Sequence, residues 1–103
     1  FRSAVIKSEE ENQFVYDLLI NTSGKNNVPG WIGLHRKADN KFYWLDNRPV
    51  KENFQKWNEG EPNNFRGNED CVMLRRRNVN SDGKWSDRSC SETDFVAICQ
   101  WPI

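Results

Sequence analysis

Near the start of the chain, apolar positions recur with the period of an α-helix. Four of them are spaced to form one stripe of such a helix: Phe14, Val15, Leu18 and Leu19. Ser8 and Glu11 both precede the stripe and are three residues apart, which is the pattern of a capping box at a helix N-terminus. We expect the helix to end near Asn21, because Asn, Ser, Gly and Pro are frequent from there to Gly30.

Short apolar runs separated by turn-forming residues make up the rest of the pattern. They span residues 31–34, 42–45, 72–74 and 95–99. Such runs predict β-strands, with turns at residues 38–40 and 80–83.

The stretch from residue 46 to residue 70 has no period. It is polar and carries Pro and Gly, but it also contains Phe54, Trp57 and Phe65. A long irregular segment inside a small domain is usually either functional or disordered. The three aromatic residues favour a packed, functional loop.

Composition narrows the classes of protein. The chain has 103 residues, with 15 basic and 15 acidic side chains and therefore no net charge. Such a chain lacks the positive field that nucleic-acid binding uses, and no apolar run reaches the length of a membrane span. An aromatic content of 13% argues against disorder in spite of a mean hydropathy of −0.93. No signal peptide is visible at the start of the sequence.

Three cysteines are present, and their number is odd. Cys71, Cys90 and Cys99 form no C-x-x-C pair, and His35 is the single histidine, so neither a zinc site nor a thiol–histidine catalytic pair is expected. Disulfides of a secreted domain are the plain interpretation. One cysteine then remains without a partner within this chain.

Oxygen-bearing side chains cluster in and after the long loop. The sequence contains Glu61-Pro62-Asn63, Glu69-Asp70-Cys71 and Trp85-Ser86-Asp87. Carboxylate and amide oxygens are the ligands that calcium prefers. A bond between Cys71 and Cys90, one of the possible pairings, would bring these segments together. Solvated acidic loops and the carboxylate pair of a glycosidase are the alternatives, although nothing predicts the apolar pocket that a glycosidase acid needs.

At these motifs the chain resembles the C-type lectin-like domain, from Ala4 to Trp101. Residues 31–34 resemble the WIGL strand, and residues 61–63 match the EPN motif of mannose-type members. Residues 69–71 follow at the spacing found in the family, residues 85–87 stand where the family has WND, and residues 98–100 resemble its closing strand.

The resemblance implies an α+β fold of small antiparallel sheets, one helix and a long calcium- and sugar-binding loop. It implies one calcium ion, Ca2+, with these ligands: Glu61, Asn63, Glu69 and Asp87. The same side chains, together with Ser86, would contact two neighbouring sugar hydroxyls. It also implies a cis peptide bond between Glu61 and Pro62.

A disulfide between Cys71 and Cys90 is also implied by the resemblance. The family partner of Cys99 lies in a first strand and helix that are absent from residues 1–103. We therefore expect a single, N-terminally incomplete domain with Cys99 unpaired within this chain. Its partner would lie in a preceding segment or in a second chain.

The sequence departs from the family at two places. Ser86 replaces an asparagine, which removes an amide group from the ligand set. A second, auxiliary calcium site is not expected, because Asn64 is neutral and Arg36 and Lys37 are basic.

These observations predict a secreted or extracellular protein that is not an enzyme and that binds carbohydrate through calcium. The Glu-Pro-Asn order goes, in the family, with sugars that have equatorial 3- and 4-hydroxyls, such as mannose. The alternatives are a calcium-independent domain that binds protein and a structural protein of matrix or mineral. Asn21 is a glycosylation acceptor if the protein is secreted, and residues 75–77 are either a solvated basic hairpin or a contact for a sulfated or sialylated ligand.

Overall fold

The computed structural model describes residues 2–3, 5–22, 29–75, 83–92, 96–97 and 99–100. Among these residues it shows one helix and short strands in an α+β arrangement. In chain order the elements are β1 (Arg2–Ser3), α1 (Glu9–Thr22), β2 (Gly30–Arg36), β3 (Phe42–Trp44), the 3-10 turns Val50–Glu52 and Phe65–Gly67, β4 (Cys71–Leu74), β5 (Trp85–Arg88), β6 (Val96–Ala97) and β7 (Cys99–Gln100).

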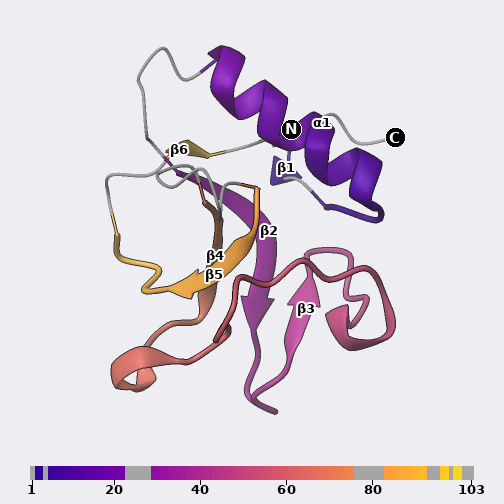
Figure 1. Cartoon of the computed structure of the whole chain (residues 1–103). Helices are drawn as coiled ribbons and strands as arrows, with labels where there is room; N and C mark the ends of the chain where they lie inside the picture. Colours follow the sequence, from indigo (N-terminus) through magenta and orange to yellow (C-terminus); the bar gives the residue numbers. More distant parts are fainter. Residues whose placement is uncertain are drawn as a thin grey trace.

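The main sheet is built around β2. The strand order is β3-β2-β4-β5 with antiparallel neighbours, and β6 joins β2 in parallel at Gly30 and Trp31. A second sheet pairs β1 with β7 and so joins the two ends of the described chain. Figure 1 shows α1 at one end of β2, and the long connection between β3 and β4 at the other. The α+β architecture is confirmed, and so are the strands predicted at residues 31–34, 42–45 and 72–74. The run 95–99 does not form one strand, because its described residues belong to β6 in the main sheet and β7 in the second sheet. Residues 80–82, 95 and 98 and the side chain of Cys99 lie outside the described residues.

The helix begins as the capping pattern predicts. Ser8 Oγ accepts a hydrogen bond from the N–H of Glu11 at 3.1 Å. The Glu11 carboxylate accepts from the N–H of Lys7 at 2.9 Å, one residue earlier than in the usual reciprocal pair. These contacts satisfy two donors at the start of α1, and the helix extends one residue beyond Asn21.

The predicted helix stripe is partly wrong. Val15 and Leu19 are buried, but Phe14 is 68% exposed, and the polar Asn12 is buried in its place. Residues 12, 15 and 19 share one line along a helix at spacings of three and four, and this line faces the sheet.

Asn12 is a polar connection between α1 and β5 that the sequence pattern did not predict. Its amide Nδ2 donates to the carbonyl of Gly83 at 2.7 Å, and its Oδ1 accepts from Trp85 Nε1 at 2.8 Å. Burial of the Trp85 indole N–H and of the Asn12 amide is tolerated because each has a partner. This pair of bonds fixes the start of β5, the strand that carries Asp87.

The long loop is packed through Phe54 and Trp57, as predicted, whereas Phe65 is 58% exposed. The Trp85 ring is fully buried and contacts the rings of Trp44, Trp57 and Phe54 at 5.5–5.8 Å between centroids. The backbone of Trp85 also donates to Lys56 and accepts from Asn58, both at 2.8 Å. The loop is thereby held alongside β5. Trp44 is also buried, whereas Trp31 is only half-buried.

Candidate functional site

The segment from residue 61 to residue 70 forms a tight reversal. The peptide bond between Glu61 and Pro62 is cis, which confirms the family expectation. Asn64, Arg66 and Gly67 all have positive φ, a conformation that asparagine and glycine tolerate better than most residues. The reversal returns the chain on itself, so that the N–H of Glu69 donates to Asn64 Oδ1 at 3.0 Å.

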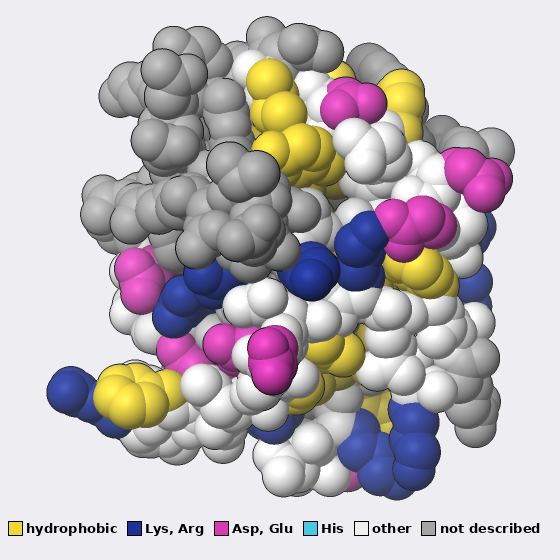
Figure 2. All heavy atoms as spheres, viewed as in Figure 1, with side chains coloured by type: hydrophobic (Ala, Val, Ile, Leu, Met, Phe, Trp, Pro, Cys, Tyr) yellow, Lys and Arg dark blue, Asp and Glu magenta, His cyan; other side chains and the backbone are white. Residues whose placement is uncertain are grey.

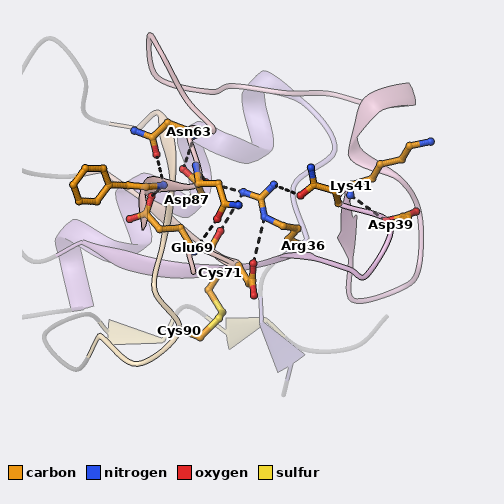
Figure 3. Close-up of polar contacts among 12 residues, drawn as sticks. Arg36, Asp39, Lys41, Asn63, Glu69, Cys71, Asp87 and Cys90 are labelled. Atoms are coloured by element: carbon orange, nitrogen blue, oxygen red, sulfur yellow. Dashed lines mark hydrogen bonds and ion pairs between the residues drawn. A yellow bond between two sulfur atoms is a disulfide. The ribbon is translucent and has the colours of Figure 1, made fainter. Parts of the chain in front are cut away.

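Asp87 is the centre of the site. It lies on β5 and is fully buried. Its carboxylate accepts hydrogen bonds from the N–H of Asn63 at 3.1 Å and the N–H of Asn64 at 2.7 Å. It also accepts from Arg36 Nη2 at 2.9 Å (Figure 3). One carboxylate therefore joins β5 to the loop and to the end of β2.

Glu61 lies against Asp87. Burial raises the pKa of Glu61 to about 7, and hydrogen bonding to Asp87 together with the charge of Asp87 adds to the rise. The positive charge of Arg88 acts in the opposite direction. Glu61 Oε1 is buried and has no hydrogen-bond partner among the described residues. The negative charge of Asp87 therefore favours the protonated form of Glu61.

Glu69 and Asn63 complete the cluster. Glu69 is buried, and its Oε1 accepts from the N–H of Phe65 at 3.0 Å while Oε2 lies 4.0 Å from Arg88 Nη1. Asn63 Oδ1 accepts from the same N–H of Phe65 at 3.2 Å. The structure thus brings together Glu61, Asn63, Glu69 and Asp87, the four residues that the sequence motifs indicated.

Ser86 has a different position. It is fully buried, and its hydroxyl accepts a hydrogen bond from Arg75 Nη1 at 3.0 Å. Successive residues of a strand point to opposite faces, so Ser86 and Asp87 leave β5 on opposite sides. The structure therefore does not gather Ser86 with the other four. Arg76 and Arg77 lie outside the described residues.

The expected disulfide between Cys71 and Cys90 is present. It joins the start of β4, directly after Glu69 and Asp70, to the segment that follows β5 (Figure 3). Cys99 consequently has neither of these two cysteines as a partner.

Two arginines contact the carboxylates of the site, and the sequence motifs did not predict either contact. Arg36 contacts Asp87, and Arg88 faces Glu69. The only sequence signal for Arg36 was its positive charge after the WIGL strand, which argued against a second calcium site. Figure 2 shows basic and acidic side chains side by side on the face drawn there.

The chemical type of the candidate ligands suits a hard cation such as calcium. Glu61, Asn63, Glu69 and Asp87 offer only oxygen, and the unpartnered Oε1 of Glu61 is an available ligand beside Asp87. Within the described part of the chain, however, no three carboxylate, histidine or cysteine side chains converge as a metal site. Arg36 takes up one side of Asp87. A cation at this site would therefore compete with the proton on Glu61 and with the Arg36 guanidinium.

The raised pKa of Glu61 leads to a prediction for stability in the presence of a chelator. In the folded protein the Glu61 carboxyl group holds its proton up to about pH 7, whereas in the unfolded chain it releases the proton near the ordinary pKa of 4.5. Because the folded state then binds more protons, stability falls as pH rises from about 4.5 to about 7. Glu61→Gln should remove this loss. The free energy of unfolding of the variant, measured in urea, should therefore rise relative to that of the parent between about pH 4.5 and about pH 7. The difference should reach the order of 1 kcal/mol, after allowance for solvent screening.

The control for this prediction is Glu59→Gln, which changes an exposed residue two positions away. It should show the pH dependence of the parent. An equal pH profile for Glu61→Gln and the parent would contradict the assignment of the raised pKa.

Comparison with known proteins identifies the family. The family model for the lectin C-type domain matches residues 3–101, and the chain belongs to that family. It is 39% identical over 100 residues to C-type lectin domain family 4 member M from Gorilla gorilla gorilla, covering 95% of this chain and 23% of that protein. It is 36% identical over 75 residues to P-selectin from Mus musculus, covering 68% of this chain and 10% of that protein. The chain thus spans only a fraction of the length of these two relatives.

Solved structures agree with this assignment. The cow C-type carbohydrate-recognition domain of CD23, crystallised in the presence of a GlcNAc2Man3 oligosaccharide, superposes with a TM-score of 0.66 at 33% identity. The match covers 86% of this chain and 60% of that one. The family is one of binding proteins, with carbohydrate binding represented among its members.

No described helix is both long and apolar enough to cross a membrane.

Proposed function

We propose that this domain binds carbohydrate through a calcium ion held by Glu61, Asn63, Glu69 and Asp87. The observation that carries the proposal is the position of Glu61 against the buried Asp87, where Glu61 Oε1 has no hydrogen-bond partner among the described residues. The N–H of Asn63 donates to Asp87, and Asn63 and Glu69 both accept from the N–H of Phe65, so the other two proposed ligands belong to the same loop. Calcium, when bound, supplies a positive centre that can accept sugar hydroxyl oxygens. Glu61 and Glu69 accept hydrogen bonds from those hydroxyls, and the Asn63 amide donates one.

The preferred sugars are those with equatorial 3- and 4-hydroxyls, with mannose the test case. The acceptor Glu61 precedes the donor Asn63, which is the order that the mannose-type family members have. Support comes from the CD23 domain, whose structure was determined with a mannose-containing oligosaccharide. Ser86 has no amide group, and its hydroxyl bonds to Arg75 on the other face of β5, so it supplies no hydrogen bond to the sugar. One hydrogen bond fewer lowers sugar affinity by about 0.5–1.5 kcal/mol, so binding is weak.

The setting of the domain is secreted or extracellular, as its disulfide favours. The domain carries no catalytic role in this proposal. In this proposal residues 1–103 belong to one domain, in which β1 pairs with β7.

The second candidate is calcium-independent binding of a protein ligand. The contact between Arg36 and Asp87 favours it, because a guanidinium already neutralises the central carboxylate. The same fold can serve either function, so only the site decides between them.

Glycan binding in calcium, repeated in chelator, tests the proposal. Mannose should bind more strongly than galactose and only with calcium. Calcium should also raise the melting temperature, because a ligand that binds the native state stabilises it. Glu61→Ala should abolish that rise, while the neighbouring control Glu59→Ala should keep it.

Two results would count against this proposal. Equal or stronger binding of galactose would contradict the sugar preference. The absence of any glycan binding in calcium, with an unchanged melting temperature, would favour the protein-binding alternative.

A further inference from the structure

Arg36 lies inside the carboxylate cluster, where its side chain is 11% exposed. Nη2 donates to Asp87 Oδ2 at 2.9 Å and to the carbonyl of Glu69 at 3.2 Å. Nε lies 3.3 Å from Asp70 Oδ1. A single side chain from the end of β2 therefore contacts β5 and the last residues of the 61–70 loop (Figure 3).

The other side of the same guanidinium is also occupied. Nη1 donates to Asn40 Oδ1 at 3.1 Å, and Cζ lies 4.4 Å from the centre of the Phe42 ring. The planar fork of arginine suits several partners at fixed angles, and an aromatic face adds a cation–π contact. The β2–β3 turn and the start of β3 thus hold the Arg36 side chain in place beside the loop.

The charge of the cluster requires such a group. Four carboxyl groups gather within the loop and β5: Glu61, Glu69, Asp70 and Asp87. Among the described residues, Arg36 and Arg88 are the cations paired with them. Of the two, Arg36 contacts the buried carboxylate directly, whereas Arg88 stays 4.0 Å from Glu69. Removal of the positive charge beside Asp87 would leave this buried carboxylate without a directly bonded cation, which is costly.

We propose that Arg36 is a built-in counter-ion that holds the 61–70 loop in its folded shape without a metal ion, and that it weakens calcium binding by competing for Asp87. The first half is independent of calcium. The second half rests on the proposed function. An arginine keeps its charge at all ordinary pH values, so a divalent cation at Asp87 always meets a like charge nearby.

Amide hydrogen exchange in the presence of chelator tests the first half. The N–H groups of Asn63, Asn64 and Phe65 each donate to a side chain of the cluster. In the parent they should be protected without metal. Arg36→Met should speed their exchange by roughly tenfold or more, because Asp87 then lacks its counter-ion. Arg36→Lys keeps a charge but not the fork, and should give a smaller acceleration.

The matched control is Arg48→Met, which breaks an exposed ion pair with Asp46 at 2.8 Å. It should leave the three loop amides unchanged. Parent amides that are protected only when calcium is added would overturn the proposal. Parent-like protection in Arg36→Met would also overturn it. Should Arg36→Met not fold, Arg36→Gln, which also removes the charge, replaces it, and parent-like protection in Arg36→Gln would overturn the proposal.

Calcium titration of the same variants tests the second half. Calcium should bind Arg36→Met roughly tenfold or more tightly than the parent, since a like charge has been removed. Equal affinity in the two proteins would overturn the competition. A lack of calcium binding in every variant would overturn the proposed function together with this second half, and the exchange measurement in chelator would still decide the first half on its own.

Discussion

Asp87→Ala is expected to lower the free energy of unfolding by about 3–5 kcal/mol, the cost typical of removing one member of a buried ion pair. The substitution leaves the Arg36 guanidinium without its closest carboxylate. It also leaves the N–H groups of Asn63 and Asn64 without their acceptor. Since a change of 1 kcal/mol shifts the melting temperature of a domain this size by about 4–8 °C, the loss should exceed about 10 °C.

The control for Asp87→Ala is Asp46→Ala, which removes the carboxylate of the exposed pair with Arg48. Exposed pairs contribute about 0–1 kcal/mol, so the control should unfold close to the parent. Both variants are to be measured by urea unfolding in chelator, which excludes any contribution of bound calcium. Similar unfolding midpoints for the two variants would show that Asp87 does not organise the loop.

Replacing Cys71 and Cys90 together by serine is expected to lower stability by about 3 kcal/mol, because the loss of loop closure increases the entropy of the unfolded chain. The disulfide closes a segment with a sequence separation of 19 residues. The bond also fixes the end of the site loop, because Cys71 follows Asp70 directly and pairs with Arg88 in the β4–β5 register. Equilibrium unfolding in guanidinium chloride measures the change.

Reductant supplies the control for the disulfide prediction. Reduced parent protein should unfold at the midpoint of the Cys71→Ser/Cys90→Ser variant, and reductant should leave that variant unchanged. If the variant and the oxidised parent share a midpoint, the disulfide contributes nothing measurable to stability.

Local patterns in the sequence determined the elements and the identity of the site donors. Ser8 and Glu11 fixed the start of α1, because capping depends only on residues a few positions apart. The Glu-Pro-Asn and Glu-Asp-Cys motifs, together with Asp87, named four residues that the fold does bring together. Phe54 and Trp57 indicated correctly that the long polar loop is packed, although Phe65, which supported the same prediction, is exposed.

Tertiary structure decided which of these groups face one another. Phe14 has the right spacing for the helix stripe but is exposed, because the sheet contacts the line through Asn12, Val15 and Leu19. Ser86 adjoins Asp87 in sequence, yet strand alternation turns its hydroxyl to Arg75. The sequence also placed a basic residue at position 36, but only the strand order, with β4 alone between β2 and β5, brings its side chain within reach of Asp87. A pairing between residues 51 positions apart depends on how the strands pack, and no local pattern in the chain encodes it.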